Sequence, residues 1–161
     1  MVFGAGRYCR RVGFSPVGLI VSLAVLAPNF LLLLPLRDPA PAVRLPPLLD
    51  WVERAGQALC LVVPAITAPG VLTWWWAVPV AAGLAGYYAL WVRYLRAGRP
   101  VAALYRRACG VPVPMAILPV VVFLAASGWL GNPWIAAAAV VLGAGHIPAA
   151  MITARTLDVP R

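Results

Sequence analysis

Charged side chains are scarce in this sequence, and lysine is absent. Only 11% of the 161 residues are charged, whereas hydrophobic residues make up 63%. A water-soluble protein usually carries about 25% charged residues, because its surface has to be hydrated. Together with a mean hydropathy of +0.91, this composition argues against a soluble domain and indicates a membrane protein.

Acidic residues are scarcer still. Four Asp and Glu stand against 13 arginines, which gives a net charge of +9. Such an excess suits a partner that carries phosphate groups, either nucleic acid or anionic lipid. In so apolar a chain we interpret it as a topology and lipid signal, and we expect no nucleic-acid partner. The apolar stretches contain no acidic or basic residue, which argues against proton-coupled transport by this chain alone.

Motifs for soluble-type catalysis and for cofactor binding are missing. The chain has no P-loop, GxGxxG, GxSxG or HExxH pattern, and His146 is its one histidine. The cysteines Cys9, Cys60 and Cys109 lack CxxC spacing, so they form neither a disulfide framework nor a metal-ligand set. We predict no catalytic residue, no cofactor and no metal site, and an enzymatic activity is the weaker alternative.

Long apolar runs are what the chain has in abundance. A helix of about 20 apolar residues crosses a bilayer. Five segments approach this length: 17–36, 55–72, 75–92, 111–130 and 134–154. The turn Gly131-Asn132-Pro133 joins the last two as a helical hairpin. We therefore predict an all-α fold, in which residues 1–161 form one polytopic membrane domain with a bundle of about five transmembrane helices.

The arginines predict the orientation of this bundle. If all five segments span, ten of the 13 arginines lie on the side of the loop 93–107 and the C-terminus. This places that side in the cytoplasm and the protein in a bacterial inner membrane. In the alternative, the first segment is re-entrant at Pro28-Asn29 and every arginine lies inside. Signal-peptide cleavage at Ala40-Pro41-Ala42 is not expected, because the preceding apolar run is too long and prolines crowd the site.

The connection from Arg37 to Arg54 is rich in proline, so we expect it to be partly extended. Near its end, Asp50 and Glu53 have the N-cap and N3 spacing of a capping box for the next helix. The alternative interpretation of this DxxE pair is a catalytic or metal-binding role. That role lacks a third ligand, so we prefer the cap.

Aromatic residues flank the third segment, and a basic loop follows it. Trp74, Trp75 and Trp76 fit an aromatic belt at one membrane boundary. At the other end of the segment the belt residues are Tyr87, Tyr88, Trp91 and Tyr94. We expect the arginines of the loop to contact anionic lipid head groups: Arg93, Arg96, Arg99, Arg106 and Arg107.

Few polar side chains remain inside the apolar segments. Among them His146, Asn29 and Gln57 form the candidate intramembrane polar site. Each segment also contains a proline, and a proline kink frees a backbone carbonyl. Such carbonyls coordinate ions in transporters, but membrane helices also tolerate proline without that role, and we prefer the structural interpretation.

The histidine lies on a stripe of mostly small residues in the last segment. Steps of three and four residues link Ala136, Ala139, Gly143, His146, Ala150 and Thr153. This spacing is typical of a helix-packing seam. We predict that the imidazole points into the bundle and hydrogen-bonds there, for example to a carbonyl freed by a kink. A ligand-binding or proton-handling role is the alternative.

The same small-residue logic predicts two helix contacts and one lipid face. Gly86 and Gly143 each follow an alanine by four residues, a spacing that lets helices approach closely. We predict that both glycines lie at helix contacts. The face of the last segment that we expect to meet lipid consists of Val140, Ala144, Ile147 and Met151.

Three stretches of the C-terminal half resemble a family of small, uncharacterised multi-pass bacterial membrane proteins. They are YYALWVRYLRAGR (87–99), VPVPMAILP (111–119) and GHIP (145–148). The resemblance implies location and architecture only. From the residues themselves we predict an accessory or scaffold subunit that acts through helix–helix contacts with a second copy or a partner membrane subunit. A small permease or channel-like protein and a lipid-modifying membrane enzyme are the alternatives.

Overall fold

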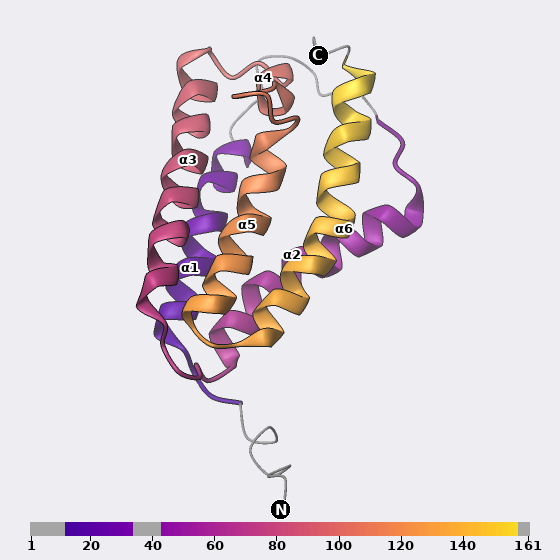
Figure 1. Ribbon diagram of the computed structural model, residues 1–161. Helices are drawn as coiled ribbons and strands as arrows, with labels where there is room; N and C mark the ends of the chain where they lie inside the picture. Colours follow the sequence, from indigo (N-terminus) through magenta and orange to yellow (C-terminus); the bar gives the residue numbers. More distant parts are fainter. Residues whose placement is uncertain (1–11, 34–42, 158–161) are drawn as a thin grey trace, which may run out of the picture.

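The computed structural model describes residues 12–33 and 43–157, and this part of the chain is helical without a strand, which confirms the predicted all-α class (Figure 1). Residues Cys9 and Ala40-Pro41-Ala42 lie outside the described residues. The elements in chain order are α1 (Pro16–Leu26), η1 (Ala27–Leu33), α2 (Pro47–Ile66), η2 (Trp74–Trp76), α3 (Ala77–Arg96), α4 (Ala102–Tyr105), α5 (Pro114–Trp129) and α6 (Pro133–Thr156).

Prolines begin four of these helices, since a proline in the first turn gives up an N–H that has no intrahelical partner. Two of the starts also have a polar cap. The Ser15 hydroxyl oxygen accepts from the Gly18 N–H at 3.1 Å, and the Asn132 side-chain oxygen accepts from the Trp134 N–H at 3.1 Å. The turn Gly131-Asn132-Pro133 therefore follows α5 and starts α6.

The predicted capping box at Asp50 and Glu53 is wrong. Helix α2 begins at Pro47, so both acids lie inside it, and its N-cap Pro46 makes no side-chain hydrogen bond. The expectation of extended chain up to Arg54 is wrong over 47–54 for the same reason. Asp50 instead accepts from the Arg54 side chain at 3.0 Å, and Glu53 turns to another helix.

The first apolar segment breaks where Pro28-Asn29 predicts, because α1 ends at Leu26 and a 3-10 helix continues to Leu33. In Figure 1 the two run on in one direction, so residues 16–33 show no reversal. The re-entrant alternative needs such a reversal at this point, and the described residues contradict it.

The helices pack in pairs. In Figure 1, α1, α3 and α5 stand side by side, α6 follows α5 as a hairpin, and α2 crosses α6 obliquely. The contact between α2 and α6 is the most extensive of the fold. A large apolar core joins α1, α3, α5 and α6, and its centre consists of Val122, Phe123, Ile135 and Ala139.

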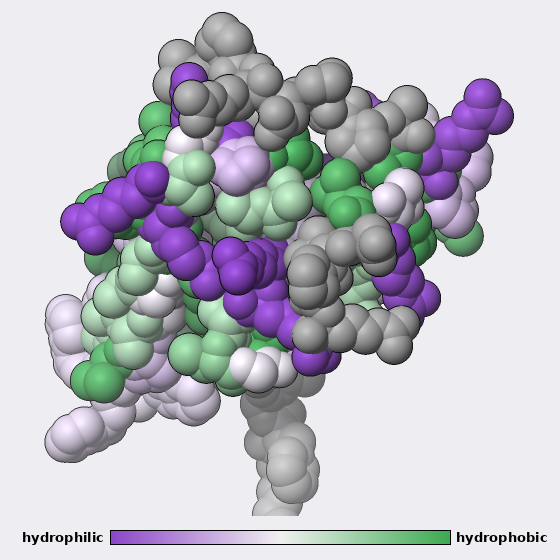
Figure 2. Space-filling view, turned by 90° about the horizontal axis from the view of Figure 1, so that it is seen from above, coloured by the Kyte–Doolittle hydropathy of each residue, from purple (hydrophilic) through white to green (hydrophobic). Residues whose placement is uncertain are grey.

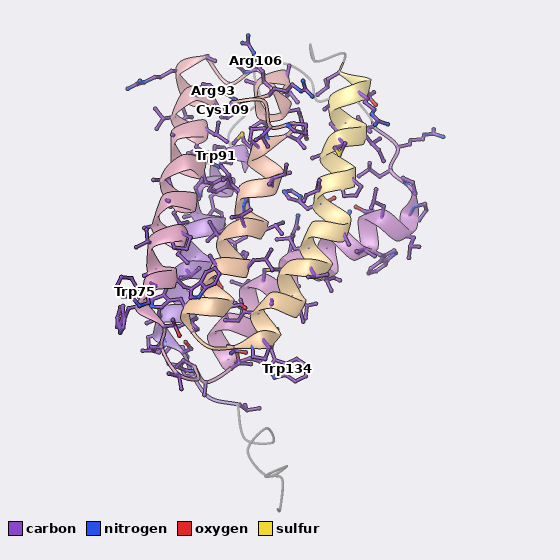
Figure 3. All side chains as sticks on the ribbon, viewed as in Figure 1. Trp75, Trp91, Arg93, Arg106, Cys109 and Trp134 are labelled. Carbon is purple, nitrogen blue, oxygen red and sulfur yellow. The ribbon has the colours of Figure 1, made fainter. Side chains whose placement is uncertain are left out.

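Two ends of the molecule differ in their side chains (Figure 3). The tryptophan end carries the exposed residues Trp74, Trp75, Trp76 and Trp134. The arginine end carries α4 with Arg93, Arg96, Arg106 and Arg107. Seen from above, the arginine end shows hydrophilic side chains gathered over apolar ones (Figure 2).

Hydrogen bonds between segments tie the tryptophan end together. The N–H groups of Gly13 and Ser15, before α1, donate to the carbonyls of Ile66 and Ala65 at the end of α2, at 2.8 and 2.9 Å. The linker after α2 bonds to the α5–α6 turn through two further backbone bonds, Gly70 to Leu130 at 2.7 Å and Thr73 to Trp129 at 2.9 Å. The Asn132 amide also donates to the Thr67 hydroxyl at 2.7 Å.

One proline kink is satisfied by a neighbouring helix. Pro64 lies inside α2 and has no N–H for the carbonyl of Cys60. The hydroxyl of Ser22, fully buried on α1, donates to that carbonyl at 2.8 Å. For Pro64 the freed carbonyl is thus a helix–helix contact, as the structural interpretation of the prolines expects.

Only α6, among the described helices, is long and apolar enough to cross a membrane, with 24 residues and a mean hydropathy of 1.9 over its apolar window. The stretch Pro16–Leu32 and helix α5 are apolar but shorter. One such helix does not by itself separate a membrane protein from a soluble one with a buried apolar helix.

Candidate ligand cavity

A cavity of about 420 Å³ lies among the helices, toward the arginine end of the fold. Its wall takes residues from α1, η1, α2, α3, α4, α5 and α6, and most of the wall is apolar or aromatic. Ligand sites typically have volumes of about 300–1,000 Å³ and apolar walls with a few convergent polar groups. The polar groups of this wall form two clusters.

The first cluster is built where α2 crosses α6. At Gly56 and Gly145 the two backbones touch. A Cβ atom at Gly145 would overlap the backbone nitrogen of Glu53, and one at Gly56 would overlap the Cα atom of Leu142. This contact brings the neighbouring side chains Glu53 and His146 together, and the His146 Nδ1 and Glu53 Oε1 atoms are 2.7 Å apart.

The pair is partly accessible, because 28% of the His146 side chain and 17% of the Glu53 side chain are exposed. The Gln57 amide, one turn further along α2, donates to the same Glu53 oxygen at 3.4 Å. When Glu53 is ionised its carboxylate only accepts hydrogen bonds, and the proton of the shared bond then lies on the His146 Nδ1 atom. A distance of 2.7 Å is typical of a hydrogen bond strengthened by charge.

Sequence reasoning placed His146 inside the bundle with a partner, and the structure identifies that partner as an acid. The expected partner, a carbonyl freed by a proline kink, is wrong. Glu53 was missed because its spacing from Asp50 suggested a cap. Its spacing from Gln57 and Cys60, which puts all three on one face of α2, is the signal that could have found it.

The buried face of α6 is shifted by about one residue from the helix-packing seam that the sequence predicts. The buried residues of α6 are Ile135, Ala138, Ala139, Leu142, Gly145, Ala149 and Ala150, so Ala139 and Ala150 alone are shared with the prediction. Val140 and Ala144 are exposed as expected for a lipid face, whereas Ile147 and Met151 pack on apolar clusters. The rotation follows from the crossing at Gly145, which sets the face that α2 meets.

The second cluster faces η1 and α3. The Tyr87 hydroxyl donates to the Asn29 side-chain oxygen at 3.3 Å. The Trp91 indole also lies at the cavity wall. Its N–H is buried and makes no hydrogen bond of good geometry among the described residues. The Tyr87 hydroxyl is nevertheless close enough to interact with the indole. The structure thus places all three predicted polar residues, His146, Asn29 and Gln57, on the wall of one cavity, with Asn29 in the second cluster.

Tyr105 of α4 lines the cavity next to the first cluster. Burial raises the pKa of its hydroxyl, the negative charge of Glu53 raises that pKa further, and a hydrogen bond with the Thr153 side chain lowers it. No group of three or more His, Cys, Asp or Glu side chains that could hold a metal ion occurs in the described part of the chain. Cys60 and Cys109 are free thiols, and Cys60 belongs to the cavity wall.

The predicted belt on the third segment is wrong for three of its four residues. Tyr87, Trp91 and Tyr94 are buried, because they pack in one ladder of edge-to-face rings against α5. Tyr88 is exposed and donates to the Ala24 carbonyl at 2.9 Å. Trp74, Trp75 and Trp76 are exposed, as a belt position requires.

The arginines of the basic loop gather at the arginine end. Arg96, Arg106 and Arg107 are exposed, whereas Arg93 and Arg99 are half-buried. The Arg93 side chain donates to the Arg106 carbonyl at 3.3 Å, which joins the two halves of the loop (Figure 3). Helix α3 ends at Arg96, and Arg99 has a φ of 65°, so Arg99 does not continue the helical row expected for it.

The two predicted packing glycines lie beside side chains of α5. A Cβ atom at Gly86 would stand 3.6 Å from Leu118, an ordinary contact distance, and one at Gly143 would stand 3.2 Å from Val120. The tighter approaches occur at other glycines: at Gly18, where α1 meets the Pro64 carbonyl of α2, and at Gly56 and Gly145, where α2 crosses α6. The spacing of small residues in the sequence did not identify these glycines as the positions of closest helix contact.

The chain matches no family model, no curated protein and no solved structure. No matched protein therefore supports the resemblance of its C-terminal half to a bacterial membrane family. What the protein does has to be inferred from the cavity and the surface.

Proposed function

We propose that the protein is a multi-pass bacterial inner-membrane protein with five transmembrane helices: α1 with η1, α2, α3, α5 and α6. Large apolar side chains face outward along these helices, among them Ile20, Leu61, Val78, Val121 and Val140. Helices α2 and α3 have 20 residues each, which gives about 30 Å, the thickness of the hydrocarbon core. In Figure 1 the successive helices α1, α2, α3, α5 and α6 alternate in direction, with α2 oblique to the other four.

In this proposal the arginine end lies in the cytoplasm and the tryptophan end at the opposite surface. Cys109 is an exposed native thiol at the arginine end and reports on the orientation (Figure 3). With Cys9 and Cys60 changed to serine, Cys109 should resist a membrane-impermeant maleimide in intact cells and react after permeabilisation. The matched variant is Trp134→Cys with all native cysteines removed, which should react in intact cells. Reversed labelling of the two sites contradicts the orientation.

For activity we propose that the protein is a small permease-type protein that binds a small molecule in the cavity. The Glu53–His146 pair in the cavity wall carries this proposal. Ionisable groups within membrane segments are costly and usually mark substrate or proton pathways, and transporter sites lie between broken helices near the bilayer midplane. Glu53 also supplies an acid beside His146, although the predicted apolar stretches contain none.

Efflux from proteoliposomes tests this activity. Two solutes with one carbon skeleton and permanent charges do not leak through lipid: 4-phenylbutyltrimethylammonium and 4-phenylbutanesulfonate. At least one of the two solutes should leave vesicles with the wild-type protein faster than vesicles with Ala150→Trp, a substitution that places a bulky side chain in the cavity. Ala144→Trp, two turns away on the exposed face of α6, is the control and should leave efflux unchanged. Equal efflux of both solutes with all three proteins contradicts the proposal.

An accessory or scaffold subunit is the second candidate, and the first half of α2 favours it. Leu48 and Trp51 are 77% and 71% exposed there, next to the exposed Asp50–Arg54 ion pair. A charged pair beside large apolar side chains in a membrane calls for a covering chain. Purification in native detergent separates the two candidates: a stoichiometric second chain supports the scaffold, and a lone chain or homo-oligomer with efflux activity supports the permease.

A further inference from the structure

We infer that the cavity selects an organic cation with an apolar body, an inference that rests on the proposed small-molecule function. The charge of the wall carries it. Among the described residues that line the cavity, Glu53 is the one acid, and no arginine is present. The described arginines do not line the cavity, so the charge of the wall itself comes from the Glu53–His146 pair.

The hydrogen bond between the two side chains fixes what the pair offers a ligand. Because the His146 Nδ1 atom donates to Glu53 Oε1, a neutral imidazole has its lone pair on Nε2. The second carboxylate oxygen of Glu53 also accepts. In the state with an ionised Glu53 and a neutral His146, the pair carries a single negative charge. An anion or an uncharged carbonyl gains nothing from such a group, whereas an ammonium group is attracted to it.

The rest of the wall suits an apolar body attached to the cationic group. The rings of Tyr87, Trp91, Phe123 and Tyr105 line the cavity together with aliphatic side chains of α5. Aromatic rings attract a cation that lies within about 6 Å of a ring face, and they bury apolar ligand surface as well. The volume of about 420 Å³ admits one compact ligand of this kind.

Binding of the two charged probes to purified protein in nanodiscs tests the charge preference. By calorimetry, 4-phenylbutyltrimethylammonium should bind at least about tenfold more tightly than 4-phenylbutanesulfonate. Glu53→Gln keeps the shape and removes the charge, so it should abolish the preference. Asp50→Asn makes the same charge change one turn away, outside the cavity, and should keep it.

The native thiols show where the cation binds and need no substitution near the pair. Cys60 lines the cavity and Cys109 is exposed outside it. The Cys60 thiol is buried and reacts slowly, so its labelling is followed over hours with excess N-ethylmaleimide; the cation should slow it further and leave the faster reaction of the exposed Cys109 unchanged. This readout keeps the inference testable even where Glu53→Gln does not fold.

The outcomes are separable. Cation preference in the wild type that is lost in Glu53→Gln and kept in Asp50→Asn, with protection of Cys60, supports the inference. Equal or tighter binding of the sulfonate overturns the charge preference but leaves small-molecule binding in place. Cation binding without protection of Cys60 overturns the location. If neither probe binds and neither leaves proteoliposomes, the inference and the proposed permease activity fail together.

Discussion

Helices α2 and α6 cross with their backbones in contact, whereas α3 and α5 are separated by side chains. At Gly56 and Gly145 the neighbouring atoms belong to the main chain of the other helix. At Gly83 of α3 the neighbour is the Val122 side chain, whose Cγ2 atom would lie 2.7 Å from an added Cβ atom. The α2–α6 contact also holds the Glu53–His146 pair, and the α3–α5 contact is aromatic and aliphatic.

This difference shows how one bundle combines a rigid contact with an adaptable one. A side chain changes its rotamer at small cost, but a backbone contact changes only if a whole helix moves. The rigid contact is the one beside the polar pair. The distance between Glu53 and His146 is therefore set by main-chain packing, and substitutions in the two contacts should differ in effect.

The largest effect is expected for Gly145→Ala or Gly56→Ala. The new methyl group meets main-chain atoms that cannot rotate away, so we expect a loss of about 3 kcal/mol in stability. Thermal denaturation in detergent measures it. Gly143→Ala, two residues from Gly145 and facing the Val120 side chain, is the control and should cost much less. Equal losses at the two positions would show that the backbones are not in contact.

A smaller effect is expected for the polar pair. His146→Leu leaves the Glu53 carboxylate without its partner and should lower stability by about 2 kcal/mol, whereas His146→Gln retains a donor and should cost less. A double variant with Glu53→Ala and His146→Leu should lose less than the sum of the single losses, because neither group is left unpaired. Additive losses would mean that the two side chains do not interact.

The α3–α5 contact should tolerate substitution better. Gly83→Ala requires a shift of the Val122 side chain and should cost about 1 kcal/mol. Gly86→Ala meets Leu118 at an ordinary 3.6 Å and gains helix propensity, so stability should stay within about 0.5 kcal/mol of the wild type. A larger loss at Gly86 than at Gly83 would reverse this order.

The smallest effect concerns Tyr105, beside the α2–α6 pair. Burial raises the pKa of its hydroxyl above the usual value of about 10, so the folded protein keeps this proton at a pH where the unfolded chain has lost it. The resulting stabilisation is complete below pH about 10 and is lost as the pH rises through the raised pKa. The midpoint of thermal denaturation should therefore fall more steeply above this pH in the wild type than in Tyr105→Phe. Parallel curves would contradict the assignment.

Much of the local structure could be predicted from the sequence. The predicted apolar segments overlap the long helices, although α2 covers Pro47–Ile66 and not 55–72. Pro28-Asn29 breaks the first segment, and Asn132 with Pro133 starts the last helix. These features depend on residues close in sequence, whose propensities act locally. The error at Asp50 and Glu53 was also local, because Pro47 competes as a helix start and lies upstream of both acids.

The candidate site could be predicted only in part, because it depends on how two distant helices cross. His146 and Glu53 are 93 residues apart in the chain. Periodicity showed that α6 has a face of small residues, but it did not show which residue of that face meets α2. A shift of about one residue moved the buried seam from Gly143 and His146 to Leu142 and Gly145. The burial of Tyr87 and Trp91 was missed for the same reason, since apolar spacing does not distinguish a lipid face from a cavity wall.

If the cavity binds a ligand as proposed, the hydrogen bonds at the tryptophan end favour its entry and exit on the opposite side. None of the residues from Thr67 to Trp76 lines the cavity, and four backbone bonds with the Asn132–Thr67 bond join three segments beneath it. Separating them inside a membrane would leave polar groups without partners, at several kcal/mol each. Among the described residues, fewer such bonds join separate segments on the α4 side. In this conformation the cavity is closed at the tryptophan end. Passage of a ligand to that surface would first require the hydrogen bonds there to break, and we expect this step to be slow.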